Sequence, residues 1–155
     1  MIVYSSIKRN FVIDVMTNQI EKTILASFVR ELGHSTGKSE VASWRDSMLY
    51  MNNIVSDSEI PDDAGVAIEY KIPQTSKRID FILTGINSKN RKTAILIELK
   101  QWSDGISTTE KDGIVNTKFF GEVSHPSYQV WSYATLLEDY NANVQDQDIS
   151  LVPCA

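Results

Sequence analysis

Glu98 and Lys100 stand two residues apart at the end of an apolar run, in the segment Ile97-Glu98-Leu99-Lys100. Successive side chains of a β-strand point to opposite faces, so the carboxylate and the ammonium would lie together, with Leu99 turned to the other face. Residues 93–97 before them are almost wholly apolar, which is typical of a strand buried on both faces. A charged pair at the end of such a strand is costly to desolvate unless a metal ion or a counter-charge compensates. The pair therefore indicates a functional site.

A plainer alternative is a solvated surface pair. An acid and a lysine two residues apart on an edge strand usually contribute about 0.2–1 kcal/mol and have no further role. Other residues favour a site. Asp80 lies among apolar neighbours in an earlier strand-like run, residues 77–83. Gln129 and Tyr133, four residues apart, would share one face of a later helix.

In chain order, Asp80, Glu98-Leu99-Lys100 and Gln129-x-x-x-Tyr133 resemble the PD-(D/E)xK nuclease superfamily, in particular its RecB-like and λ-exonuclease-like branch with a Q-x-x-x-Y helix motif. The chain departs from the superfamily at Ile79, where a proline often precedes the first acid. The resemblance spans most of the chain. It implies an α/β fold with a restriction-endonuclease-like αβββαβ core, in which helices flank a central mixed sheet.

More local similarity links the chain to the N-terminal region of bacterial DUF2075-type proteins, which join such a region to a P-loop helicase domain. The similar segments are Ser58–Gly65, Gln74–Asp80 and Ser124–Gln129. This resemblance implies a fused or associated helicase or ATPase as a partner. Residues 1–155 would then form a single nuclease-like domain, either a short protein or the N-terminal part of a longer one.

The nuclease resemblance implies hydrolysis of phosphodiester bonds in DNA, or alternatively in RNA, with Mg²⁺ or Mn²⁺ as cofactor. Mg²⁺ prefers carboxylate and other oxygen ligands, so Asp80 and Glu98 would bind it, with the Leu99 carbonyl as a third ligand. A divalent ion neutralises charge on the phosphoryl oxygens and lowers the pKa of bound water. Lys100 would position or deprotonate the attacking water. Gln129 and Tyr133 would orient Lys100, water or phosphate.

The superfamily often adds a helical glutamate to its site, and three residues are candidates here. Glu21 falls in the first expected helix, Glu40 begins the second, and Glu69 lies on the first expected strand. Glu40 has a simpler role, because an acid in a first turn stabilises the helix dipole. Element order favours Glu21 as the further metal ligand.

Other residues able to contact nucleic acid have simpler structural explanations. His125 could touch phosphate, but a lone histidine more often makes local hydrogen bonds. Aromatic rings can stack on bases. At helical or strand spacing they more often belong to the core, and we expect this of Trp44, Trp102 and Trp131.

The elements expected to position these residues alternate between helical and strand-like patterns. A lead-in, Val3–Asp14, is anchored by Phe11 and Val12. Thr17 or Asn18 would cap a helix that continues through Leu32 and ends at Gly33, and Ser39 would cap a second helix. A further helix follows Pro126, which suits a first turn. The expected strands are Val66–Ile72, Arg78–Thr84, Thr93–Gln101 and Ile149–Ala155, with a short one at Ile114–Phe119 inside a loop from Ser103 to His125.

The segment from Gly33 to Ser39 imitates a phosphate-binding P-loop. That motif has four residues between its glycines and follows a strand, whereas here three residues separate Gly33 and Gly37 and a helix precedes them. A helix stop, a turn and a helix cap explain the segment better.

Composition is ordinary for a compact globular domain, with 42% hydrophobic and 23% charged residues. Cys154 has no partner cysteine, and two histidines give no zinc-ligand cluster. No apolar run is long enough to span a membrane and no signal-peptide pattern is present, so a cytoplasmic location is the default expectation.

Charge is distributed unevenly along the chain. The net charge of −5 should repel nucleic acid, yet residues 71–118 carry nine basic and five acidic side chains. A basic face on an acidic domain can bind nucleic acid weakly and with strong salt dependence. The overall charge keeps open a second function, a catalytically silent nucleic-acid-binding or interaction module of a helicase or defence protein. The last strand could pair with a second copy, so a homodimer is a further expectation.

Overall fold

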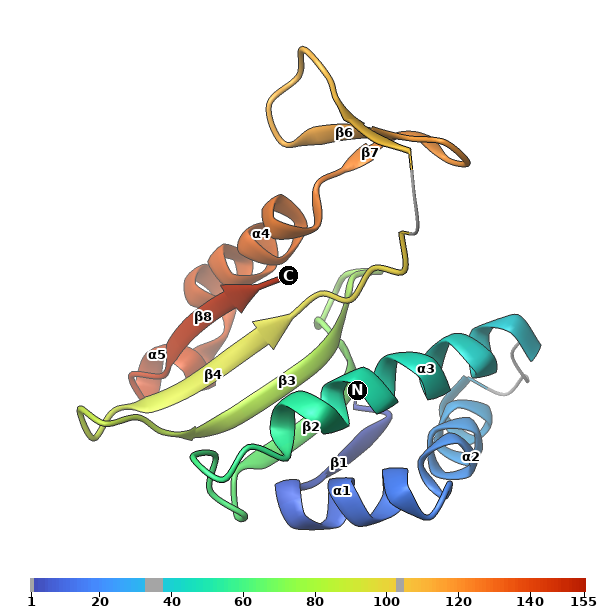
Figure 1. The fold of residues 1–155 in the computed structure, drawn as a ribbon. Coiled ribbons are helices and arrows are strands. Elements are labelled where there is room, and N and C mark those ends of the chain that lie inside the picture. The colour runs from blue at the N-terminus through green and yellow to red at the C-terminus, as the bar shows by residue number, and fades with distance from the viewer. Residues whose placement is uncertain (1, 33–37, 103–104) are drawn as a thin grey trace. The chain divides into compact units, whose positions relative to one another are not determined.

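The computed structural model describes residues 2–32, 38–102 and 105–155, and the chain divides into two compact units, residues 1–85 and 86–155 (Figure 1). Both units combine helices and strands, which confirms an α/β class in general terms. The imitation P-loop and the helix stop expected at Gly33 lie outside the described residues, as does the start of the loop expected from Ser103.

In the first unit, two strand pairs adjoin three helices. β1 pairs with β2 and β2 with β3, both antiparallel. The helix α3 packs against both α1 and α2. The elements are β1 (Tyr4–Ile7), α1 (Lys8–Met16), α2 (Ile20–Leu32), α3 (Lys38–Val55), β2 (Gly65–Lys71) and β3 (Arg78–Ile86).

The core of this unit forms where apolar side chains recur at the period of each element. Phe11 of α1 is fully buried, and its ring meets that of Phe81 of β3 edge-on, with centroids 5.4 Å apart. Along α2, Ile20, Ile24 and Phe28 recur every four residues, and all three are buried. The helical periodicity predicted for α2 is therefore confirmed, although Val29 on the same helix is exposed.

The start of the chain differs from the expected lead-in. Val3–Asp14 contributes the strand β1 and most of the helix α1. The helix was missed because it begins without a side-chain cap and its apolar residues are irregularly spaced. Lys8 is buried there, and its ammonium donates to the carbonyls of Asp57, at 2.9 Å, and Ile60.

The helix caps expected at Thr17 or Asn18 and at Ser39 are also wrong. Thr17 ends α1, with its hydroxyl donating to the Ile13 carbonyl at 2.7 Å, and Asn18 has a left-handed backbone with φ of 54°. α2 therefore begins later, at Ile20. α3 begins at Lys38, so Ser39 lies inside the helix rather than before it.

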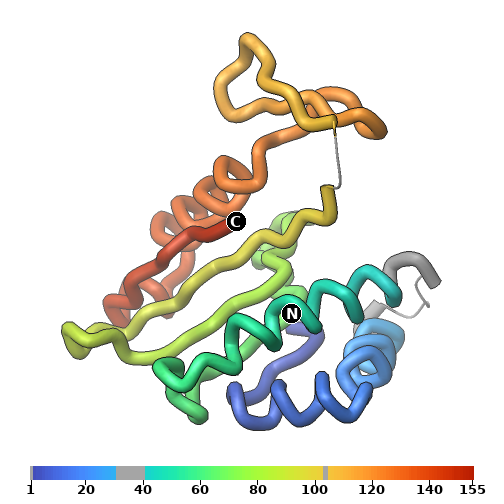
Figure 2. Tube along the Cα trace, viewed as in Figure 1, coloured from blue at the N-terminus to red at the C-terminus, as the bar shows by residue number. Residues whose placement is uncertain are grey.

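In the second unit, β4 and β8 run side by side as a parallel pair (Figure 2). Ala94 lies opposite Leu151 in this pair. A parallel pair needs a long crossover. The crossover here includes α4, which packs on both strands. It also includes an antiparallel sheet of three short strands in the order β5-β6-β7. The elements are β4 (Lys92–Ile97), β5 (Ile106–Thr108), β6 (Ile114–Thr117), β7 (Gly121–Ser124), α4 (Pro126–Tyr140), α5 (Ala142–Asp146) and β8 (Ser150–Cys154).

Most strands agree with the sequence to within two residues, and two expectations are corrected. The strand expected over Thr93–Gln101 ends at Ile97, so Glu98 and Lys100 follow it rather than belong to it. The loop expected up to His125 contains the β5-β6-β7 sheet, and the short strand ends at Thr117 rather than Phe119. The helix beginning at Pro126 is confirmed. Among the helices that the structure describes, none is both long and apolar enough to cross a membrane.

The Tyr4→Phe variant tests the packing of β1 on α1. The Tyr4 hydroxyl donates to the Asp14 carboxylate at 2.8 Å, and burial, followed by this hydrogen bond, raises the pKa of Tyr4 far above its ordinary value. At pH 7 the variant should lose about 1 kcal/mol of unfolding free energy. The unfolding free energy of the wild type should fall as pH rises above about 10, because Tyr4 then releases a proton in the unfolded state and retains it in the folded state.

Urea titrations at pH 7 and pH 10.5 measure both effects. Tyr140→Phe is the matched control, because Tyr140 is 80% exposed and its loss should leave the pH dependence of stability unchanged. Equal pH dependence in wild type and Tyr4→Phe would contradict the role of the buried hydroxyl.

Candidate active site

The candidate site is built on Glu98, which directly follows the buried strand β4. Its backbone N–H donates to the carbonyl of Cys154 in β8 at 3.0 Å, so the chain remains tied to the neighbouring strand beyond the end of β4. The Glu98 residue is only 3% exposed. Burying a carboxylate in this way is costly unless charged or polar groups compensate.

Two side chains converge on one oxygen of this carboxylate. The Lys100 ammonium lies 2.5 Å from Glu98 Oε1, and the Gln129 side-chain amide donates to the same oxygen at 2.5 Å. Bonds that combine an ionised group with a donor are among the stronger hydrogen bonds in proteins. Lys100 still exposes 29% of its side chain, so the buried acid is paired with a partly exposed lysine.

The first turn of α4 positions Gln129. Pro126 occupies the start of the helix, and His125 caps it by accepting the Ser127 N–H on Nδ1 at 3.2 Å. The Gln129 N–H in turn donates to the His125 carbonyl at 2.9 Å. His125 therefore has the local hydrogen-bonding role expected of it. Tyr133, one turn beyond Gln129, is buried on the same helix.

The structure thus brings together three of the predicted residues, Glu98, Lys100 and Gln129. Their contact did not require a continuous strand, because the side chains of Glu98 and Lys100 meet even though both follow β4. Leu99 between them is half-buried. The functional roles predicted for these residues and for Tyr133 stay predictions.

Asp80 belongs to the first unit, where it is half-buried on β3. The β2–β3 pairing places Ile68 opposite Phe81 and Tyr70 opposite Ile79, so Glu69 stands opposite Asp80 in the ladder. Among the three candidate acids, Glu69 is therefore the one on the strand next to Asp80. Glu21 instead lies on α2.

The other two candidates have different surroundings. Glu21 lies 3.9 Å from the Arg45 guanidinium, which gives it a structural explanation. Glu40 falls in the first turn of α3, outside the residues whose side chains the structure describes. The preference for Glu21 as a metal ligand rests on element order, and the choice among the three acids stays a prediction.

Glu69 is unusual in its backbone and in its burial. Its φ of 55° is rare for a residue with a side chain and costs on the order of 1 kcal/mol. This turn in the backbone leaves the consecutive residues Ile68 and Glu69 both buried. The Trp44 indole donates to Glu69 at 3.2 Å, and the Arg78 guanidinium lies 3.2 Å from the same carboxylate. The sequence offered one signal for this network, because a buried indole N–H usually finds a hydrogen-bond partner.

The three tryptophans differ from one another. Trp44 is buried, which confirms its expected core position, and Trp102 is half-buried. Trp131 is 53% exposed, so the core expectation is wrong for it. Its ring packs on that of Tyr128, with centroids 5.7 Å apart, on the outer side of α4.

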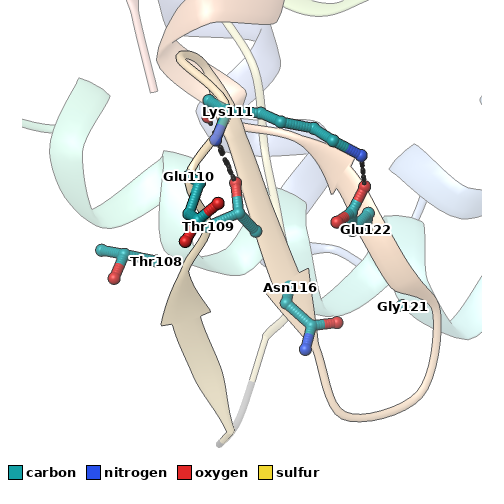
Figure 3. Close-up of a pocket in the computed structure, with 7 residues that line it drawn as sticks. All are labelled: Thr108, Thr109, Glu110, Lys111, Asn116, Gly121 and Glu122. Atoms are coloured by element: carbon teal, nitrogen blue, oxygen red, sulfur yellow. Dashed lines mark hydrogen bonds and ion pairs between the residues drawn. The ribbon is translucent and has the colours of Figure 1, made fainter.

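A shallow pocket on the β5-β6-β7 sheet lies apart from these residues (Figure 3). Two of its charged residues pair with each other, because the Lys111 ammonium lies 2.5 Å from the Glu122 carboxylate. Thr109 accepts a hydrogen bond from the Lys111 backbone at 3.2 Å. Since no predicted catalytic residue lines the pocket among those that the structure describes, it is not the candidate site.

The donors near Lys100 fit an oxygen-binding ion. The Glu98 carboxylate and the Leu99 carbonyl are of the kind that Mg²⁺ binds, usually through one or two carboxylates together with water and substrate phosphate. Within the described part of the chain, no three His, Cys, Asp or Glu side chains gather into a complete metal site.

Comparisons with known proteins place the chain in no family. No family model, curated protein or solved structure matches it.

The Trp44→Phe variant tests the buried network around Glu69. Removing the indole N–H takes a hydrogen bond from a buried carboxylate, so we expect a loss of about 1–3 kcal/mol in unfolding free energy. Trp131→Phe is the control, because Trp131 is half-exposed and the same substitution should cost much less. Equal losses in the two variants, measured by urea unfolding, would contradict the network.

Unfolding of Lys100→Ala tests the energetic coupling of the site. Loss of the ammonium leaves the buried Glu98 carboxylate without its cation, and we expect a cost of about 1–2 kcal/mol, reduced from fully buried pairs because Lys100 is partly exposed. Adding Glu98→Gln should recover part of that cost, because a neutral amide needs no counter-charge.

The exposed pair of Lys111 and Glu122 supplies the matched control. Lys111→Ala and Glu122→Gln should have small effects that add to within about 0.5 kcal/mol. If Lys100→Ala and Glu98→Gln were additive to the same degree, the proposed coupling would be wrong.

Proposed function

We propose that this chain is a divalent-metal-dependent nuclease that hydrolyses phosphodiester bonds. The observation that carries the proposal is the buried Glu98 carboxylate, bonded at one oxygen by Lys100 and Gln129. A surface ion pair does not explain an acid that is only 3% exposed and bonded from a separate helix. The order of Asp80, the Glu98–Lys100 pair and the Gln129–Tyr133 helix motif adds support.

The finer fold belongs to the same proposal. We infer a restriction-endonuclease-like αβββαβ core from the chain order of a helix, the strands β2, β3 and β4, then the helix α4 and the strand β8. A single nuclease-like domain over residues 1–155 is part of this inference. The three short strands inserted before α4 are not part of this αβββαβ core.

The metal would be Mg²⁺ or Mn²⁺, held by Glu98 and the Leu99 carbonyl, with Asp80 as the further carboxylate that the motif supplies. When bound, the ion would neutralise charge on the phosphate and make a bound water more acidic. Glu69 is a further candidate ligand from the strand paired with that of Asp80.

The protein's own side chains would orient the reacting groups. Lys100 is partly exposed beside Glu98, and its ammonium would donate to the attacking water or to a phosphoryl oxygen. Such a donor is most effective where negative charge develops in the transition state. Gln129 fixes the orientation of the Glu98 carboxylate through its amide. Tyr133, buried one turn later, would hold that part of α4 in place.

A second candidate function is supported by the charge of the chain. With a net charge of −5, the protein would bind nucleic acid weakly and could serve as a silent binding or interaction module. For either function we propose that the nucleic-acid partner is DNA rather than RNA. We also propose that a helicase or ATPase is associated with the chain and that the protein acts in the cytoplasm. A homodimer through the last strand stays a prediction.

Cleavage of labelled DNA tests the nuclease. With Mg²⁺ or Mn²⁺, we expect wild type to cut and Lys100→Ala and Glu98→Gln to be slower by about 100-fold or more. Asp80→Asn should have a similar effect if the motif assigns it correctly. Lys111→Ala is the matched control, because it removes a lysine from the same unit without touching Glu98.

Two outcomes would reject the nuclease. One is cleavage that continues in excess chelator, and the other is cleavage by Lys100→Ala at the wild-type rate. Salt-dependent DNA binding without cleavage, combined with no heat of metal binding in calorimetry, would select the silent binding module.

A further inference from the structure

The turn between β6 and β7 carries two exposed phenylalanines. Phe119 is 75% exposed and Phe120 is 74% exposed. The turn itself is built by other groups, because the buried Thr117 hydroxyl accepts the Phe120 N–H at 3.1 Å and donates to the Gly121 carbonyl at 3.2 Å. Gly121 supplies the left-handed backbone, with φ of 65°. Since the turn does not require aromatic residues, two adjacent exposed rings indicate a binding surface.

These rings line a notch that begins directly after the Glu98–Lys100 segment. The notch is lined by Gln101, Trp102, Ile106, Thr117, Lys118 and the two phenylalanines. Trp102 is two residues from Lys100 along the chain. The notch therefore adjoins, in sequence and within one unit, the segment that we propose to be catalytic.

The notch also carries positive charge. The Lys118 ammonium lies 5.6 Å from the centre of the Phe119 ring, and among the described residues of the lining none is acidic. The absence of a side chain at Gly105 lets the stem of Lys118 lie close to the backbone, because a Cβ at that position would come within 2.9 Å of the Lys118 Cβ. An aromatic surface with a cation is unexpected in a chain of net charge −5, and it complements a ligand that has both flat rings and phosphates.

We propose that this notch binds an unpaired nucleobase, so that the substrate is single-stranded nucleic acid. Bases would stack on Phe119, Phe120 or Trp102, and Lys118 would contact the adjoining phosphate. Stacking of this kind contributes substantially per base and tolerates any sequence. In a duplex the base faces are already covered by their neighbours, so the notch would have little to bind. The proposal rests on the nuclease function and names its substrate class.

Fluorescence anisotropy with a labelled twelve-nucleotide oligo(dT) and a twelve-base-pair duplex tests the proposal. Excess chelator keeps the strands intact. We expect wild type to bind the single strand more tightly, and the double variant Phe119→Ala/Phe120→Ala to weaken this binding at least about fivefold. Phe119→Tyr/Phe120→Tyr, which keeps both rings, should bind within about twofold of wild type. Tyr140→Ala, an equally exposed aromatic at the far end of α4, should bind as wild type.

The outcomes separate this proposal from the nuclease function. If the double alanine variant kept both cleavage and single-strand binding, the proposed binding role of the notch would be wrong and the nuclease function would remain supported. Ring-dependent single-strand binding without cleavage would support the notch while the nuclease failed. Sedimentation of the same variants covers the remaining outcome: ring-dependent self-association, with no ring-dependent oligonucleotide binding, would make the rings a protein contact and overturn the proposal.

Discussion

The interaction on which the second unit depends is the pair of bonds to the buried carboxylate of Glu98. An ionised carboxylate cannot be removed from water at the end of an apolar strand without compensation. Two side chains compensate the buried charge, one close to Glu98 in sequence and one far from it. Lys100 follows the acid almost at once, whereas Gln129 arrives through the crossover that ends in α4. The requirement to satisfy one oxygen therefore links β4 to the helix that packs on it and on β8.

The same bonds explain why the parts of the unit have the positions they do. β8 lies parallel to β4 and accepts the Glu98 N–H at its Cys154 carbonyl, so the acid is held by its backbone as well as its side chain. His125 and Pro126 start α4 at a defined residue, which places Gln129 in its first turn. A carboxylate held in this way cannot rotate to solvent at little cost. Such preorganisation is what the proposed metal site would require of its carboxylate.

Elements with a strong periodic pattern could be predicted from the sequence, and short irregular ones could not. α2, α4 and the strands β2 and β3 have clear periods and appear close to where the pattern places them. α1 has no capping signal. The strands β5 and β7 have three and four residues, too few for alternation to distinguish them from a loop, whereas the short strand β6 was expected and differs only at its end.

The site shows the same division between what pattern reveals and what packing decides. The prediction that Glu98 and Lys100 meet is confirmed, although the strand whose alternation suggested it ends at Ile97. The four-residue spacing placed Gln129 and Tyr133 on one helix. Which polar residue becomes buried depends on tertiary contacts, so the left-handed backbone of Glu69 and its bonds could not be predicted. The exposure of Trp131 could not be predicted either, because its spacing in the sequence does not reveal which side of α4 faces water.

A crystal structure of the protein soaked in Mn²⁺, with anomalous diffraction, tests the central claim most directly. The proposed metal centre predicts an anomalous peak at bonding distance from a Glu98 carboxylate oxygen, absent from crystals of Glu98→Gln. A wild-type crystal in saturating Mn²⁺ that shows no peak at Glu98, with Lys100 and Gln129 still bonded to the same oxygen, would contradict it.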